Sequence, residues 1–228
     1  MKIQLTGAEA LDRYFELMEQ APALFESPAP ALKIVTDRAV IENWMQDSDF
    51  VIGVVYETPW NIHCVDLVEN PGGVRFPYER VLPVDLGKHH GTVILPKLGD
   101  DYILIRIFRH ALRTYVWEFP RGFNDGIDGI ANAVKELQEE IGAEVRPENV
   151  RLIGTVSPNT AFEAIYVDIF EAEIDAYHAP QEEEGITRIM QVSREELVRM
   201  IRAGEIVDSF TLTAYLLSSQ QKGEKIEQ

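Results

Sequence analysis

The segment Val134–Val145 reads VKELQEEIGAEV and gathers Glu136, Glu139 and Glu140 near the C-terminal end of a predicted helix. The helix macrodipole is negative at that end, so it disfavours carboxylates there. Glu136 and Glu140 are also four residues apart, a spacing at which like charges on a helix repel each other. Either solvent weakens this repulsion or a bound cation offsets it.

The apolar residues of this predicted helix form one narrow stripe, made of Ile130, Val134, Leu137 and Ile141. With about 100° per residue, Glu136 and Glu140 fall together on one flank of the stripe, and Glu139 points roughly away from it. We therefore expect the first two carboxylates at the border between core and solvent, where desolvation strengthens their repulsion. A hard divalent cation such as Mg²⁺ binds this kind of oxygen pair. Taken alone, E-x-x-E-E is also typical of a solvated acidic face.

The composition restricts the class of protein. Of the 228 residues, 46% are hydrophobic, which suits one large or two modest domains. The single cysteine, Cys64, cannot form an intrachain disulfide and is expected in the core. The formal charge of −17 argues against a broad nucleic-acid or membrane surface. Because the N-terminus has no apolar run of the signal-peptide type, we expect a cytoplasmic protein.

Hydrophobic patterning divides the chain near residue 88. Residues 1–87 are expected to form a helical segment followed by a small β-rich subdomain, because strand-like runs there are separated by the turn at 70–73. Across residues 88–228, strands and helices interleave without a regular βαβ rhythm. This pattern predicts an α+β fold, in which Gly142 ends one helix and Ser193 caps another.

The stretch Gly122–Ala143 resembles a Nudix box, whose pattern is G-x5-E-x7-R-E-U-x-E-E-x-G-U. The residues in register with the end of the pattern are Glu136, Leu137, Glu139, Glu140 and Gly142. Three departures are present: Asp128 replaces a Glu, the next spacer is one residue shorter, and Lys135 replaces an Arg. Lysine keeps the charge but lacks the bidentate fork of arginine, so the rate or the metal geometry is expected to differ.

The resemblance extends to about residues 88–218 and points to the ADP-ribose-pyrophosphatase-like members of the Nudix superfamily. Residues 103–122, ILIRIFRHALRTYVWEFPRG, resemble their strand and WE-[FL]-P-x-G lead-in. Residues 157–173 resemble their S-P-G-x-[ST]-x-E segment, with Asn159 in place of Gly. The resemblance implies a Nudix α/β/α sandwich with a mixed sheet, preceded by the β-rich subdomain.

The resemblance also implies a metal site. Glu136 and Glu140 would be the metal ligands, together with the backbone carbonyl of Arg121, and the cofactor would be Mg²⁺, with Mn²⁺ possible. Glu139 would have a secondary catalytic role, and Lys135 would take the place of the arginine that pairs with a catalytic glutamate.

Further roles follow from the same resemblance. In the acidic loop QEEEG, Glu182 would be the general base and Glu184 an additional metal-binding carboxylate, although any of the three glutamates could hold either register. Arg109 would contact the substrate diphosphate, Glu118 would orient the substrate, and Glu163 would help to organise the site. For Arg109 and Glu118 a structural ion pair is the alternative.

The implied reaction is metal-dependent hydrolysis of the pyrophosphate bond in a nucleoside diphosphate linked to a group X. With ADP-ribose, the products would be AMP and ribose 5-phosphate. The alternatives are a nucleotide sugar or dinucleotide as substrate, or a catalytically weak Nudix domain that binds a nucleotide and regulates. The resemblance suggests a homodimer acting on a small molecule, and the negative net charge leads us to expect no nucleic-acid or membrane partner.

Overall fold

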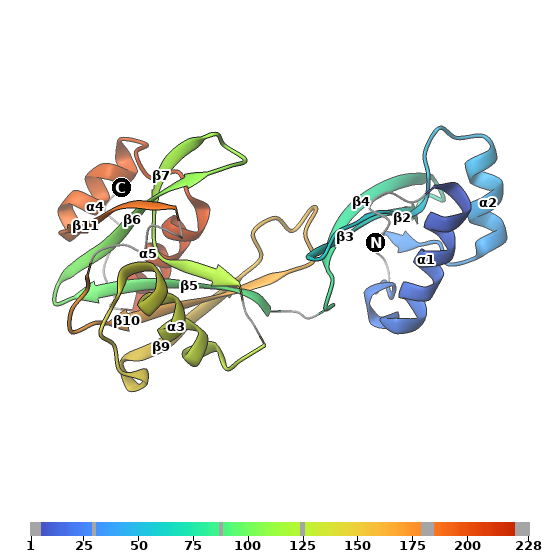
Figure 1. Ribbon diagram of the computed structural model, residues 1–228. Helices are drawn as coiled ribbons and strands as arrows, with labels where there is room; N and C mark the ends of the chain where they lie inside the picture. Colours follow the sequence, from blue (N-terminus) through green and yellow to red (C-terminus); the bar gives the residue numbers. More distant parts are fainter. Residues whose placement is uncertain (1–5, 29–30, 87–88, 124–125, 179–184, 222–228) are drawn as a thin grey trace. The chain divides into compact units, whose positions relative to one another are not determined.

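The computed structural model describes residues 6–28, 31–86, 89–123, 126–178 and 185–221 (Figure 1). The chain forms two compact units. The first comprises Met1–Lys88 with Asn159–Ile165, and the second comprises His89–Pro158 with Tyr166–Gln228. Residues 159–165, which the sequence suggested for the C-terminal domain, therefore cluster with the first unit.

Backbone hydrogen bonds attach the segment 159–165 to the first unit. Val81 N donates to Phe162 O at 2.8 Å, and Ala164 N donates to Val81 O at 3.0 Å. Ala164 also packs against the apolar core of this unit. The pairing joins residues that are far apart in sequence, so no local pattern could indicate it.

The first unit packs α1 and α2 with a four-stranded antiparallel sheet, in which β3 pairs with β1, β2 and β4. Its elements are α1 (Gly7–Gln20), η1 (Pro22–Leu24), β1 (Lys33–Ile34), α2 (Arg38–Gln46), β2 (Gly53–Glu57), β3 (Asn61–Glu69) and β4 (Arg75–Pro83). The Asp37 side chain caps α2 by accepting a hydrogen bond from Val40 N. Cys64 is buried in the core of this unit and is a free thiol, which confirms its expected packing role.

The second unit contains a seven-stranded mixed sheet with the order β11-β6-β5-β10-β9, in which β7 also pairs with β6 and β8 with β5. The strands are β5 (His89–Leu98), β6 (Asp101–Arg109), β7 (Thr114–Glu118), β8 (Arg121–Phe123), β9 (Val150–Val156), β10 (Tyr166–Glu173) and β11 (Ile186–Val192). Strands β5 and β10 run parallel, and the other pairs are antiparallel.

Helices cover both faces of this sheet (Figure 1). They are α3 (Gly129–Ile141), α4 (Arg194–Arg202) and α5 (Ser209–Gln221), with η2 (Pro147–Asn149) before β9. Neighbouring residues of β5 point to opposite sides, because Ile94 packs in one core with Leu137 of α3, whereas Val93 packs in another with Leu197 of α4 and Ala214 of α5. This arrangement confirms the expected α/β/α sandwich with a mixed sheet.

Helix α3 has a clear signal at each end. The Asp128 side chain caps its N-terminus by accepting hydrogen bonds from Ile130 N and Ala131 N. Gly142 adopts a left-handed conformation with φ of 56° at the C-terminus, as the sequence predicted. Among the described residues, no helix is long and apolar enough to cross a bilayer.

Candidate functional site

The acidic face of α3 lies against the backbone of β8. Arg121 N donates a hydrogen bond to Glu140 Oε2 at 2.9 Å. Gly122 follows Arg121 in β8, and Glu136 lies one helical turn before Glu140 in α3. The Glu136 carboxylate lies close to the Cα atom of Gly122. A Cβ atom at Gly122 would approach that carboxylate more closely than the 3.0 Å limit of real Cβ contacts. Successive residues of β8 thus meet carboxylates spaced by one turn of α3, and both carboxylates converge on the same short strand.

One helical turn before Glu136, Asn132 also contacts β8, at Phe123, the residue that follows Gly122. It is fully buried, and its Nδ2 donates to Phe123 O at 3.1 Å and to Thr92 Oγ1 at 3.0 Å. Its Oδ1 has no hydrogen-bond partner, although buried oxygens are normally satisfied. An unsatisfied oxygen therefore lies on the helical face that carries Glu136 and Glu140.

The two carboxylates are more deeply buried than the helical wheel predicted. Glu136 is only 8% exposed and Glu140 only 5%, so both lie inside rather than at the border of the core. Ala133 is also fully buried, whereas Ile130 and Val134 are only partly covered. The buried face of α3 is therefore rotated from the apolar stripe toward the side that carries Glu136 and Glu140, because β8 covers that side. Apolar periodicity alone could not indicate this cover.

Burial has a strong electrostatic consequence for Glu140. Loss of solvent raises the pKa of its carboxyl group, the hydrogen bond from Arg121 N lowers it, and the neighbouring Glu136 charge raises it again. The net effect raises the pKa of Glu140 from 4.5 to about 8. A cation between the two carboxylates would remove this penalty, since it would compensate both charges.

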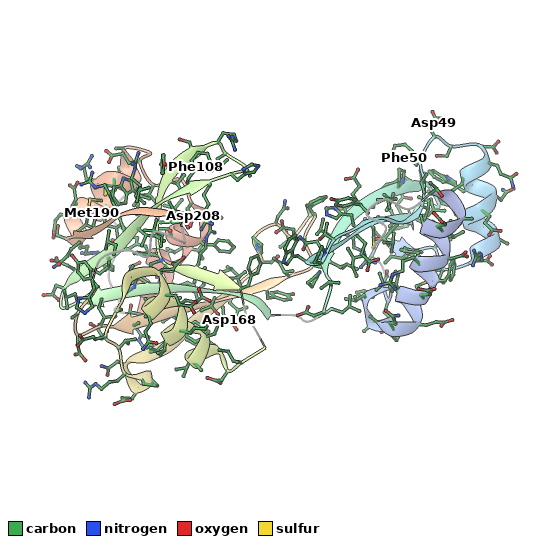
Figure 2. The ribbon with its side chains drawn as sticks, in the orientation of Figure 1. Asp49, Phe50, Phe108, Asp168, Met190 and Asp208 are labelled. Carbon is green, nitrogen blue, oxygen red and sulfur yellow. The ribbon has the colours of Figure 1, made fainter. Side chains whose placement is uncertain are left out.

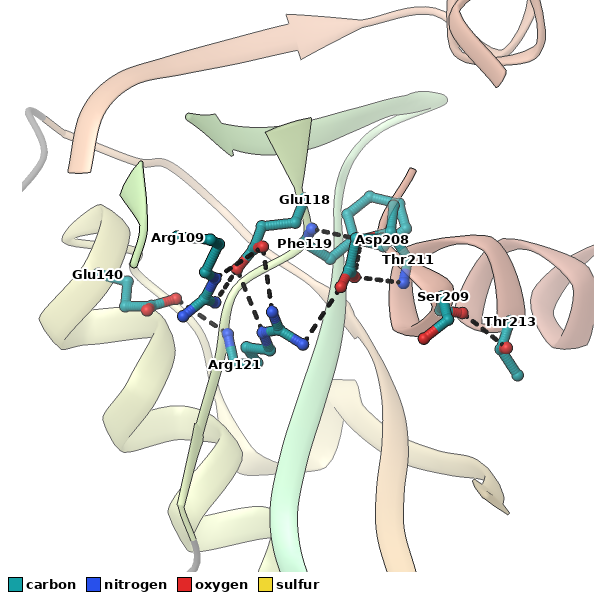
Figure 3. Close-up of polar contacts among 9 residues, drawn as sticks. All are labelled: Arg109, Glu118, Phe119, Arg121, Glu140, Asp208, Ser209, Thr211 and Thr213. Carbon is teal, nitrogen blue, oxygen red and sulfur yellow. Dashed lines mark hydrogen bonds and ion pairs between the residues drawn. The ribbon is translucent and has the colours of Figure 1, made fainter. Parts of the chain in front are cut away.

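A second polar cluster adjoins the first (Figure 3). Glu118 is fully buried and accepts hydrogen bonds from Arg109 Nε at 3.0 Å and from Arg121 Nε and an Arg121 terminal nitrogen, each at 3.2 Å. A terminal nitrogen of Arg109 also contacts Glu118. Burial lowers the pKa of Arg109, but the bond to Glu118 and the charges of Glu118 and Glu140 raise it, with a net rise. The structure thus gives both guanidinium groups a buried carboxylate partner.

The Arg121 side chain connects this cluster to the start of α5. It forms an ion pair with Asp208 at 3.2 Å, and Asp208 immediately precedes that helix (Figures 2 and 3). Sequence reasoning assigned a role only to the Arg121 carbonyl and none to Asp208. The signal for Asp208 was an acidic residue three positions before Thr211, a helix-cap spacing. That spacing indicates a cap but not an ion pair with a residue so distant in the chain.

The other expected site residues are on the exposed side of α3, in the first unit, or outside the described residues. Lys135 pairs with Glu139 at 3.7 Å, and both side chains are about half exposed, at 38% and 45%. Glu163 belongs to the first unit, where it forms a backbone bridge with Val81. Glu182 and Glu184 lie outside the described residues. The structure therefore brings together Arg109, Glu118, Arg121, Glu136 and Glu140.

The converging oxygens suit a hard divalent cation. Within the described ranges, no cluster of three or more His, Cys, Asp or Glu side chains is arranged around a common point. The oxygen ligands that the structure offers are instead the two carboxylates of Glu136 and Glu140, both held against β8. Mg²⁺ normally takes one or two carboxylates and completes its shell with water and substrate phosphate oxygens, so this donor set fits it.

Comparison with known proteins agrees with this geometry. The NUDIX domain family model matches residues 88–212, more than half of the chain. A solved structure described as "Crystal structure of ADP compounds hydrolase" superposes with a TM-score of 0.67 at 18% identity, covering 87% of this chain and 98% of that one. No match to a curated protein was found. The chain therefore belongs to the NUDIX domain family and is a hydrolase of the class that acts on pyrophosphate bonds.

Proposed function

We propose that this protein hydrolyses the pyrophosphate bond of a nucleoside diphosphate linked to a group X, with Mg²⁺ or Mn²⁺ as cofactor. The observation that carries the proposal is the convergence of two buried carboxylates, Glu136 and Glu140, on the backbone of β8. Two ionised carboxylates so close and so buried are costly without a cation. Members of the family generally use divalent metal ions, which agrees with this donor set.

Glu136, Glu140 and the carbonyl of Arg121 would hold the metal ion. When bound, the ion would supply positive charge to the diphosphate and lower the pKa of a coordinated water. The role of α3 and β8 is to keep the two carboxylates converged before substrate arrives. Arg109 and Arg121 add positive charge beside them, held in place by Glu118. Although Glu118 and Asp208 balance their charge, both guanidinium groups are partly exposed and could donate hydrogen bonds to a phosphate of the substrate.

The general base would come from the acidic loop, and Glu182 is our first candidate. A carboxylate there would accept the proton of the attacking water as it attacks phosphorus in line with the leaving group. The products would be a nucleoside monophosphate and phosphorylated X. Glu182→Gln, Glu183→Gln and Glu184→Gln, tested singly, would assign the base: the variant with the largest loss of kcat and little change in KM identifies it. Equal and small losses in all three would exclude this loop.

We propose ADP-ribose as the first substrate to test, with AMP and ribose 5-phosphate as products. The superposed structure, at 18% identity, is described as an ADP compounds hydrolase, and for that reason ADP-linked compounds are tested first. The described contacts involve groups suited to the diphosphate and the metal, not to X. Nucleotide sugars and dinucleotides therefore belong in the same panel.

The decisive experiment incubates the purified protein with ADP-ribose, ADP-sugars, NADH and diadenosine compounds, with Mg²⁺, Mn²⁺ or EDTA. Chromatography would detect the nucleoside monophosphate. We expect turnover of at least one ADP-linked compound that EDTA abolishes. Absence of turnover across the panel would reject the proposed activity and favour a nucleotide-binding regulator. Light scattering of the same sample would test the homodimer suggested by the family resemblance, and fractionation of the source cells would test the cytoplasmic location.

A further inference from the structure

We infer that Asp208 and Thr211, at the start of α5, are positioning residues for the metal and diphosphate site. Neither belongs to the Nudix box, and neither contacts Glu136 or Glu140 in the described hydrogen bonds. They act instead on the short segment Glu118–Gly122 that carries the site. The inference rests on the proposed function, since it assigns a role in the same reaction.

Thr211 connects α5 to the end of β7. It is fully buried, and its Oγ1 accepts a hydrogen bond from Phe119 N at 2.9 Å across a separation of 92 residues. The same hydroxyl donates to Asp208 Oδ2 at 2.8 Å. A hydroxyl has one proton to donate and lone pairs to accept, so both contacts are satisfied together. Thr211 therefore fixes the backbone of Phe119 to the helix.

Asp208 uses both of its carboxylate oxygens. Oδ2 accepts hydrogen bonds from Thr211 N at 2.9 Å and from the Thr211 hydroxyl, which caps the helix. Oδ1 faces an Arg121 terminal nitrogen at 3.2 Å, and the guanidinium lies over the Phe210 ring at 5.0 Å. The Arg121 side chain is thus held between Asp208 on one side and Glu118 on the other.

These contacts fix the chain on both sides of Pro120. The Phe119 backbone is bonded to Thr211, and the Arg121 side chain is paired with Asp208. The same short segment contacts both carboxylates: Arg121 N donates to Glu140, and the Cα atom of Gly122 lies beside Glu136. A shift of this segment would alter both carboxylate positions at once. Mutation of residues that support metal ligands in this way commonly lowers metal affinity or activity by about 10- to 100-fold.

The test compares Thr211→Val with Thr213→Val. Thr213 lies on the same helix and is only partly buried, and its hydroxyl donates to Ser209 O within the helix, so the matched variant removes a hydroxyl without touching Phe119 (Figure 3). Thr211→Ser should restore the hydroxyl contacts. Asp208→Asn keeps an oxygen that can accept from Thr211 N but removes the charge facing Arg121. The readouts are Mn²⁺ affinity by electron paramagnetic resonance without substrate, thermal unfolding, and kcat and KM for the best substrate.

We expect Thr211→Val and Asp208→Asn to weaken Mn²⁺ binding by about tenfold or more, with Thr211→Ser and Thr213→Val close to the wild type. Equal Mn²⁺ affinity in all variants would overturn the inference. Should Thr211→Val fail to fold, Asp208→Asn and Thr211→Ser give the same decision. A wild type that binds Mn²⁺ but turns over no substrate would reject the proposed function, while the affinity comparison would still judge the positioning role.

Discussion

The Glu136 carboxylate lies so close to the Cα atom of Gly122 that no side chain larger than that of glycine fits at position 122. A Cβ atom at Gly122 would overlap the carboxylate carbon and both oxygens of Glu136. The φ angle of Gly122 is not in the left-handed region, so glycine is required here by the carboxylate and not by the backbone conformation. The glycine with which the box pattern begins thus has a direct physical reason here, which is the close approach of a carboxylate to β8.

Gly122→Ala should displace the Glu136 carboxylate while leaving the fold intact, because the obstructing atoms are the far end of a flexible side chain. We expect Mn²⁺ affinity and turnover to fall by about 10- to 100-fold with little change in Tm. Gly7→Ala is the control, since a Cβ there meets nothing within 4 Å. Wild-type Mn²⁺ affinity in Gly122→Ala would mean that Glu136 does not bind the metal.

Glu140→Gln and Glu136→Gln should each reduce metal-dependent turnover more than about 100-fold, since the loss of a ligand exceeds the usual effect of outer residues. Glu139→Gln should have a smaller effect, because Glu139 is 45% exposed and pairs with Lys135. Steady-state kinetics over a range of Mg²⁺ concentrations would measure all three. A larger loss in Glu139→Gln than in Glu140→Gln would refute the ligand assignment.

The metal-free protein should lose stability as the pH rises from about 5 to about 8. Burial raises the pKa of Glu140 to about 8, so the folded state retains a proton that the unfolded chain releases near its ordinary value of 4.5. Folded protein therefore binds more protons in this range, and its free energy of unfolding falls as the pH increases. Mg²⁺ should raise Tm more at pH 8.5 than at pH 6, because it binds the ionised carboxylate.

Thermal unfolding in EDTA and in Mg²⁺ at several pH values would check this behaviour. Glu140→Gln should flatten the pH dependence of the metal-free protein and remove most of the stabilisation by Mg²⁺. Unchanged pH dependence in that variant would show that another group titrates.

Glu118→Gln should destabilise the second unit by about 3 kcal/mol, because Arg109 loses its carboxylate partner and Arg121 keeps only Asp208. This is the lower end of the range for buried pairs, since Arg109 and Arg121 retain 31% and 21% exposure. Glu205→Gln, in the exposed pair with Arg199, should leave the unfolding free energy nearly unchanged. Urea unfolding would measure both variants, and equal stability would show that Glu118 has no structural role.

Local sequence patterns predicted how two of the helices end or begin. The helix end at Gly142 and the Ser193 cap follow from interactions within a few residues, and the structure confirms both. The pair Glu136 and Glu140 was also visible, because the four-residue spacing puts both on one helical face.

Only the tertiary structure decided what surrounds that pair. The cover by β8, the bare Cα of Gly122 and the orphan oxygen of Asn132 depend on which strand meets α3. The same holds for Asp208 and Thr211, whose partners Arg121 and Phe119 lie far away in the chain. The sequence by itself determined the helix and its charges, since these depend on near neighbours. The structure decided their burial and their partners, since these depend on contacts between residues that only folding brings together.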